Sequence, residues 1–111
     1  MRLRHMIDAA EAVASFIAGR DRPDLATDRM LLFAVVRAVE VLGEAAARTS
    51  PETRAEAPDV PWSAIVGMRN RLIHGYFDVD ADIVWQTATA ELPDLLPRLK
   101  RLLGPQNPEA R

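Results

Sequence analysis

The sequence predicts an all-α protein, an up-and-down four-helix bundle with an additional C-terminal helix. Three observations support this: apolar residues recur at three- and four-residue steps, no segment alternates with period two, and turn-forming residues separate the apolar segments. With 111 residues, of which 49% are hydrophobic, the chain can bury one core. We expect residues 1–104 to form a single domain and residues 105–111 a loose tail.

The first helix is expected over residues 3–18. Its apolar positions have the spacing of one helical face: Leu3, Met6, Ile7, Ala10, Val13, Ala14 and Ile17. The segment GRDRPDL should end this helix, because Gly19 suits a C-terminal cap and Pro23 discourages continuation.

The second helix should begin after a capping residue, Thr27 or Asp28, and extend to about Arg48. Its segment MLLFAVVRAVEVLGEAAA is apolar almost all round, which is typical of a central helix covered by its neighbours. One side carries the exception, a polar stripe of Arg37, Glu40 and Glu44. We interpret this stripe as ion pairs between helices, in preference to the lining of a functional cleft.

The remaining helices are expected in the second half of the chain. TSPETRAEAPDVP is rich in turn formers and leaves room for one short helical turn, after which a third helix begins at Trp62 or Ser63. A fourth helix should extend from about Ala81 to Glu91, capped by the aspartates of YFDVDAD. Pro93 should bend or restart the chain before a final helix in LPDLLPRLKRLL.

Composition excludes several classes of function. The formal net charge is −2, without the basic excess that a protein dedicated to duplex DNA presents. The chain has no cysteine, which excludes disulfides, thiolate catalysis and cysteine-based zinc sites. No stretch has the pattern of a secretory signal or the length of a membrane span, so we expect a cytoplasmic protein without a membrane partner.

The stretch MRNRLIHGYF gathers the most reactive side chains of the chain. At about 100° per residue, Asn70 lies about 40° and Arg71 about 60° to either side of His74, so the three share a face. Arg69 lies about 140° around the helix from His74. Convergence of these two therefore needs either an unwound helix end at Gly75 or a second copy of the chain that faces itself.

This combination suits phosphoryl transfer on RNA without a metal or cofactor. His74, near a helix C-terminus, can act as a general acid or base on the 2′-hydroxyl or the leaving oxygen. Arg69 supplies a forked charge that stabilises the crowded phosphorane. We expect Asn70 to hold the tautomer of His74 or to face water, and Arg71 to contact phosphate or form an exposed ion pair. In the alternative interpretation, neither residue is catalytic: Arg69 is a surface arginine, and His74 caps the C-terminus of the helix.

The motif resembles that of a known family. R-N-R-L-I-H is similar to the R-x-x-x-x-H signature of the HEPN superfamily, and MRNRLIHGYF closely resembles HepT-type toxins, in which a tyrosine follows the histidine by two residues. Arg69, His74 and Tyr76 occupy these positions. Further segments resemble the family in the same order: RAVEVLGEAA, PW, DIVW and ELPDLL.

The resemblance implies a HEPN-like helical homodimer that acts as a metal-independent ribonuclease, with the two motifs meeting at the dimer cleft. It implies the toxin of a type II or VII toxin–antitoxin pair, encoded beside a minimal nucleotidyltransferase antitoxin that transfers AMP to Tyr76. Such an adduct would add negative charge and bulk where RNA must bind. Two alternatives remain open: a non-catalytic HEPN subunit that binds nucleotide or partners a nucleotidyltransferase, and a structural dimer whose motif only specifies the interface.

Three aspartates after the motif imitate the start of a calcium-binding loop: Asp78, Asp80 and Asp82. That loop requires glycine at its sixth position and glutamate at its twelfth, where this chain has Ile83 and Thr89. We therefore expect helix capping here and no metal site.

Overall fold

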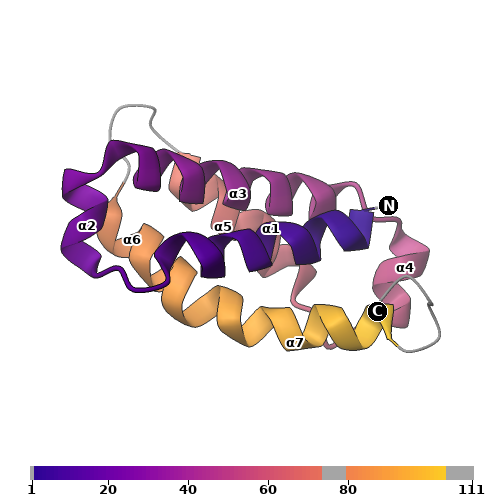
Figure 1. Cartoon of the computed structure of the whole chain (residues 1–111). Helices are drawn as coiled ribbons and strands as arrows, with labels where there is room; N and C mark the ends of the chain where they lie inside the picture. The colour runs from indigo at the N-terminus through magenta and orange to yellow at the C-terminus, as the bar shows by residue number, and fades with distance from the viewer. Residues whose placement is uncertain (1, 74–79, 105–111) are drawn as a thin grey trace.

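The computed structural model describes residues 2–73 and 80–104, and these fold into helices joined by short loops (Figure 1). The described part contains no strand, which confirms the all-α prediction. The elements in chain order are α1 (Arg2–Ile17), α2 (Arg22–Thr27), α3 (Arg29–Ala47), α4 (Pro51–Glu56), α5 (Trp62–Ile73), α6 (Ala81–Gln86), the π-helical turn η1 (Thr87–Glu91) and α7 (Leu92–Leu103). The expected tail, 105–111, lies outside the described residues.

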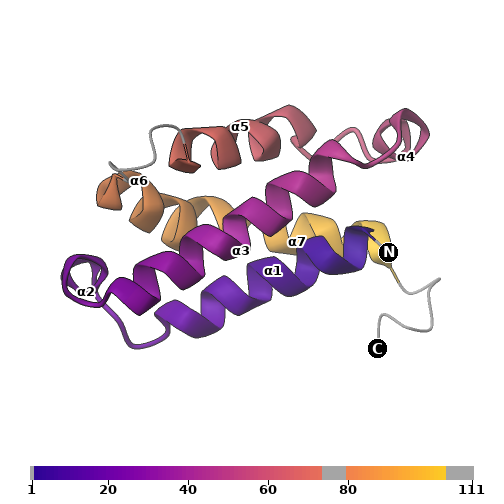
Figure 2. The same cartoon turned by 90° about the horizontal axis from the view of Figure 1, so that it is seen from above.

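The helices form two layers. Seen from above, α3 lies between α5 and α1, and the run of α6, η1 and α7 crosses beneath them (Figure 2). Each long helical segment runs opposite to the one before it, as the up-and-down prediction requires (Figure 1). Because α3 packs against both α1 and α5, it is the central element that its nearly all-round apolar sequence indicates.

The core lies between these layers. Residues that are almost completely buried come from every long helix: Met6, Val35, Leu42, Leu72 and Leu99. Trp62, at the start of α5, is buried as well, and its indole N–H donates to the carbonyl of Ala57 at 3.1 Å. This bond satisfies the polar atom of a large apolar side chain and fixes the start of α5.

Short polar side chains begin the helices where the sequence places them. The carboxylate of Asp28 accepts from the backbone N–H of Leu31 at 3.1 Å and caps α3. Asp80 accepts from the N–H of Asp82 at 2.9 Å and caps α6, which confirms the capping interpretation of this aspartate. Ser50 caps α4, the short helical turn expected in the proline-rich connection.

The helix α2 was not expected, because the segment that contains it was interpreted as a break. The backbone N–H of Asp21 donates to the Asp24 carboxylate at 2.7 Å, and Pro23 lies in the first turn, where proline is favoured. Gly19, with φ of +72°, ends the first helix as predicted. The proline therefore starts a new helix here as well as preventing continuation of the old one.

The expected fourth and fifth helices meet without a loop between them. The turn η1 joins α6 to α7, and the N–H of Leu92 donates to the carbonyl of Thr87, five residues earlier. Pro93 was expected to bend or restart the chain. It lies in the first turn of α7, and the helical run changes geometry one turn upstream of it. None of the described helices has the length and hydropathy that a membrane crossing requires.

Candidate active site

Helix α5 carries the first half of the reactive motif and stops at the edge of the described residues. Arg69 is half-buried, whereas Asn70 and Arg71 are exposed. His74, Gly75 and Tyr76 lie outside the described residues, so the expectations for the catalytic histidine, the unwound helix end and the modified tyrosine stay predictions. The described part of the site therefore consists of the contacts that α5 makes with α3 and with η1.

Arg69 lies directly against the backbone of α3 at Gly43. A Cβ atom built on Gly43 would be 2.5 Å from the Cβ of Arg69, 2.9 Å from its Cδ and 3.0 Å from its Cγ. The aliphatic part of the Arg69 side chain (its stem, Cβ to Cδ) thus occupies the space that a side chain at position 43 would take. Gly43 itself is buried, and the absence of a side chain there lets the arginine of α5 lie against the backbone of α3.

The first nitrogen of the Arg69 guanidinium, Nε, is buried. It finds no hydrogen-bond partner within residues 2–73 and 80–104. No ion pair joins Arg69 to another residue of these two segments. A buried, charged N–H needs a hydrogen-bond partner, and the described residues do not supply one for Arg69.

Arg71 extends from a different side of α5 than Arg69 does, about 200° around the helix. Its Nη2 lies 3.2 Å from Oε1 of Glu91 in η1, an ion pair between two half-exposed side chains. This is one of the two arrangements expected for Arg71. Because exposed ion pairs contribute little to stability, the side chain can exchange this carboxylate for a phosphate at small cost. Asn70 is exposed and makes no hydrogen bond to another described side chain.

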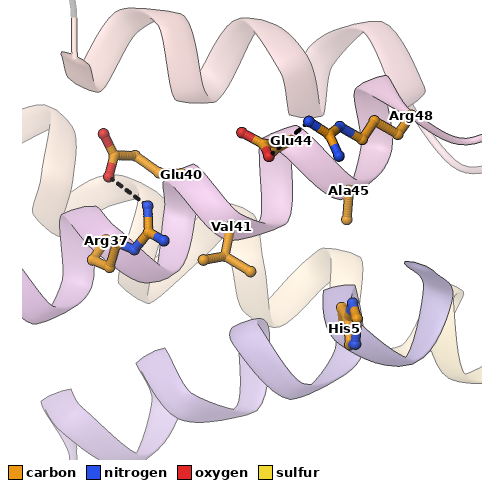
Figure 3. Close-up of a pocket in the computed structure, with 7 residues that line it drawn as sticks. All are labelled: His5, Arg37, Glu40, Val41, Glu44, Ala45 and Arg48. Atoms are coloured by element: carbon orange, nitrogen blue, oxygen red, sulfur yellow. Dashed lines mark ion pairs between the residues drawn. The ribbon is translucent and has the colours of Figure 1, made fainter. Parts of the chain in front are cut away.

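The polar stripe of α3 forms two separate ion pairs, one within the stripe and one with the residue that caps the end of the helix. Arg37 Nη1 lies 3.6 Å from Glu40 Oε1, and Arg48 Nη2 lies 3.4 Å from Glu44 Oε1 (Figure 3). The expected ion pairing is confirmed, but the pairs lie along α3 and do not bridge helices. The sequence reasoning missed Arg48, although its i,i+4 spacing from Glu44 is a recognisable signal.

The same residues line a hollow of about 510 Å³ beside α3, with His5 contributed by α1 (Figure 3). Glu40 and Glu44 extend from the side of α3 that faces α5, so they lie on the same side of α3 as Arg69 (Figure 3). Two arginines and two glutamates balance one another in this hollow. It therefore lacks the cationic lining that would attract an RNA backbone by itself.

Two of the three aspartates near the motif have partners within the described residues. Across the described segments, no three histidine or acidic side chains come close enough together to hold a metal ion. Asp80 is occupied with capping α6, and Asp82 pairs with Arg22 of α2 at 2.6 Å. Asp78, the third aspartate of the imitation loop, lies outside the described residues.

Comparison with known proteins places this geometry in a family context. The family model described as Ribonuclease HepT-like matches residues 6–102. A "putative RNase" of Caldanaerobacter subterraneus is 37% identical over 101 residues, which cover 91% of this chain and 90% of the relative. A "probable ribonuclease HepT" of Thermococcus cleftensis is 32% identical over 100 residues, covering 90% and 91%. A "putative RNase" of Methanocaldococcus jannaschii is 33% identical over 93 residues, covering 84% and 85%. No solved structure is significantly similar.

Proposed function

The chain belongs to the HepT-like ribonuclease family, and from this premise we propose that it is an endonuclease that cuts RNA without a metal. The observation that carries the proposal is the extent of the match, which includes the whole R-x-x-x-x-H motif and nearly all of the helical bundle. Relatives of similar length that bear the name ribonuclease support the same activity.

In the proposed reaction, the 2′-oxygen of RNA attacks the adjacent phosphorus, and the bond to the 5′-oxygen breaks. His74 removes the proton of the 2′-hydroxyl or gives one to the leaving oxygen. Arg69 stabilises the additional negative charge of the phosphorane, for which its forked guanidinium is suited. Asn70 and Arg71 support this centre, Asn70 by orienting the imidazole and Arg71 by contacting a neighbouring phosphate.

We place this centre in the cleft of a homodimer. A straight α5 does not direct Arg69 and His74 to one point, and a second copy can supply the missing partner. The described surface also has apolar side chains that a second copy could cover, with Met30 83% and Phe33 54% exposed on α3. A further apolar hollow of about 430 Å³ lies between α1 and α3, beside Phe16.

The cleavage proposal is tested with purified protein and a structured RNA in excess EDTA. We expect cleavage by the wild type and loss of at least a hundredfold in rate for His74→Ala and for Arg69→Ala, since each removes a group that acts on the reacting phosphate. His5→Ala is the matched control, because His5 is the only other histidine and is exposed on α1. Cleavage that survives His74→Ala would reject the proposal.

We further propose that the protein is the toxin of a pair whose antitoxin is a minimal nucleotidyltransferase. The hydroxyl of Tyr76 would attack the α-phosphorus of ATP, pyrophosphate would leave, and the bound AMP would exclude RNA by its charge and bulk. Expression of the protein alone should slow growth, and co-expression with the nucleotidyltransferase should add the mass of AMP. Tyr76→Phe should stay unmodified and toxic. Binding of the nucleotidyltransferase with no cleavage under any condition would favour a non-catalytic HEPN subunit instead.

A further inference from the structure

We propose that Gly43 of α3 is a positioning residue for Arg69, an inference that rests on the ribonuclease function proposed above. Because Gly43 has no side chain, the aliphatic part of the Arg69 side chain can pack directly against the backbone of α3. The glycine would act through Arg69 and would not touch RNA. Gly43 would determine the position of the Arg69 guanidinium. The guanidinium position in turn determines whether its charge can reach the phosphorane.

The contact involves atoms that cannot move aside. The nearest neighbour of a Cβ at Gly43 is the Cβ of Arg69, at 2.5 Å, and this atom is attached rigidly to the backbone of α5. A change of rotamer would move Cγ and Cδ of the arginine but would leave its Cβ in place. Any side chain at position 43 therefore forces α5 and α3 apart, in a packed interior that resists such shifts.

The position of the guanidinium follows from this contact. Cβ, Cγ and Cδ of Arg69 all lie within 3.0 Å of the position that a Gly43 Cβ would take, and the next atom, Nε, is buried. The aliphatic part of the side chain thus lies along Gly43, and the charged end continues from a buried Nε. A preorganised charge accelerates a reaction only when it is held within about 0.5 Å of its working position.

A second helical glycine shows that the contact is specific to position 43. Gly67 lies two residues before Arg69 on α5, and a Cβ built there meets nothing within 4 Å. Both residues occupy helix interiors, where glycine is less favourable than alanine. Only Gly43 has a packing reason for this choice, so Gly67→Ala is the matched control for Gly43→Ala.

The test reads the Nε–H of Arg69 directly by NMR on the full-length protein, with the signal assigned by its loss in Arg69→Lys. We expect a resolved, slowly exchanging signal in the wild type, unchanged in Gly67→Ala and shifted or broadened in Gly43→Ala. In RNA cleavage, Gly43→Ala should lower kcat at least tenfold and change KM less than twofold. Both are measured at a temperature where circular dichroism shows every variant folded. An unchanged Arg69 signal together with an unchanged kcat in Gly43→Ala would overturn the inference.

The two proposals fail separately. If the wild type cuts no RNA, the proposed function fails, and the NMR signal alone decides whether Gly43 positions Arg69. If Gly43→Ala does not fold, the double variant Gly43→Ala with Arg69→Gly removes the opposing Cβ and should fold again. A double variant that stays unfolded would show that position 43 matters for a reason other than Arg69.

Discussion

Arg69 and Arg71 are two residues apart on α5 and lie in opposite surroundings. The stem of Arg69 is enclosed against Gly43 of α3, whereas Arg71 is exposed and reaches Glu91 in η1. Two residues span about 200° of a helix, so neighbouring arginines of one motif meet different elements. In the proposed function, the enclosed Arg69 suits contact with the reacting phosphate. The exposed Arg71 suits contact with another phosphate of the RNA backbone.

Removing the carboxylate that pairs with Arg71 tests this division of roles. In Glu91→Gln, Arg71 loses its ion pair and becomes available to RNA, so we expect a lower KM with kcat unchanged. The free energy of unfolding should change by less than about 1 kcal/mol, because the pair is exposed. Glu44→Gln is the matched control, since it releases the exposed Arg48 by the same chemical change. An unchanged KM in Glu91→Gln would assign Arg71 to a surface ion pair alone.

Two ion pairs surround helix α2: one joins residues that flank it, and the other joins its first residue to α6. Before it, Arg20 reaches the Asp28 carboxylate at 2.7 Å, which links the end of α1 to the start of α3. From its first residue, Arg22 reaches Asp82 of α6. A helix of this length is unstable by itself, so these contacts and the burial of Leu25 hold it in place.

The pH dependence of stability should report the pair between Arg20 and Asp28. The hydrogen bond from Arg20 lowers the pKa of Asp28, with a further contribution from the N–H of Leu31. The contribution of this carboxylate to stability is therefore present above its unfolded pKa and is lost as the pH falls through its folded pKa. We expect Asp28→Asn, which keeps a capping oxygen, to be less stable than the wild type at pH 7.

The measurement is urea denaturation of the two proteins at a series of pH values. The difference between wild type and Asp28→Asn should shrink as the pH falls below the ordinary range of a carboxyl group, about 3.9. It should also shrink at high salt, because the pair is only half-buried. A difference that stays constant with pH would attribute the effect of the substitution to capping geometry.

For the whole molecule, the central question is whether one subunit contains a complete site. Arg69 faces α3 of its own chain, and in the proposed homodimer the imidazole it works with belongs to a second copy. A shared site of this kind makes activity a property of the dimer. In the proposed dimer, a second copy would also cover apolar side chains such as Met30 and Phe33, which are exposed on the described surface.

Mixing two inactive variants tests the shared site. In a heterodimer of Arg69→Ala and His74→Ala, one of the two sites receives both mutations and the other receives an intact Arg69 and an intact His74. Random pairing should therefore restore about a quarter of the wild-type activity. Sedimentation equilibrium checks that dimers are present, and each variant alone provides the baseline. No recovery in a mixture that contains heterodimers would contradict the shared site.

Much of the fold could be predicted because its signals are local. The period of the apolar residues predicted the long helices, and Asp28 and Asp80 predicted two of the starts. The helix α2 and the continuous run through η1 could not be predicted in the same way. The sequence indicates that Pro23 discourages continuation of a helix and that Pro93 bends or restarts the chain, and only the structure shows that each lies in the first turn of a helix.

The sequence by itself determined the helical class, the family and the identity of the motif residues, because periodicity, caps and motif spacing belong to neighbouring residues of one chain. The tertiary structure decided what each motif residue meets: Gly43 beneath Arg69, and Glu91 beside Arg71. These contacts join residues far apart in the chain, and they depend on where α3, α5 and η1 cross. Crossing geometry results from the packing of all side chains together, and no local pattern contains it.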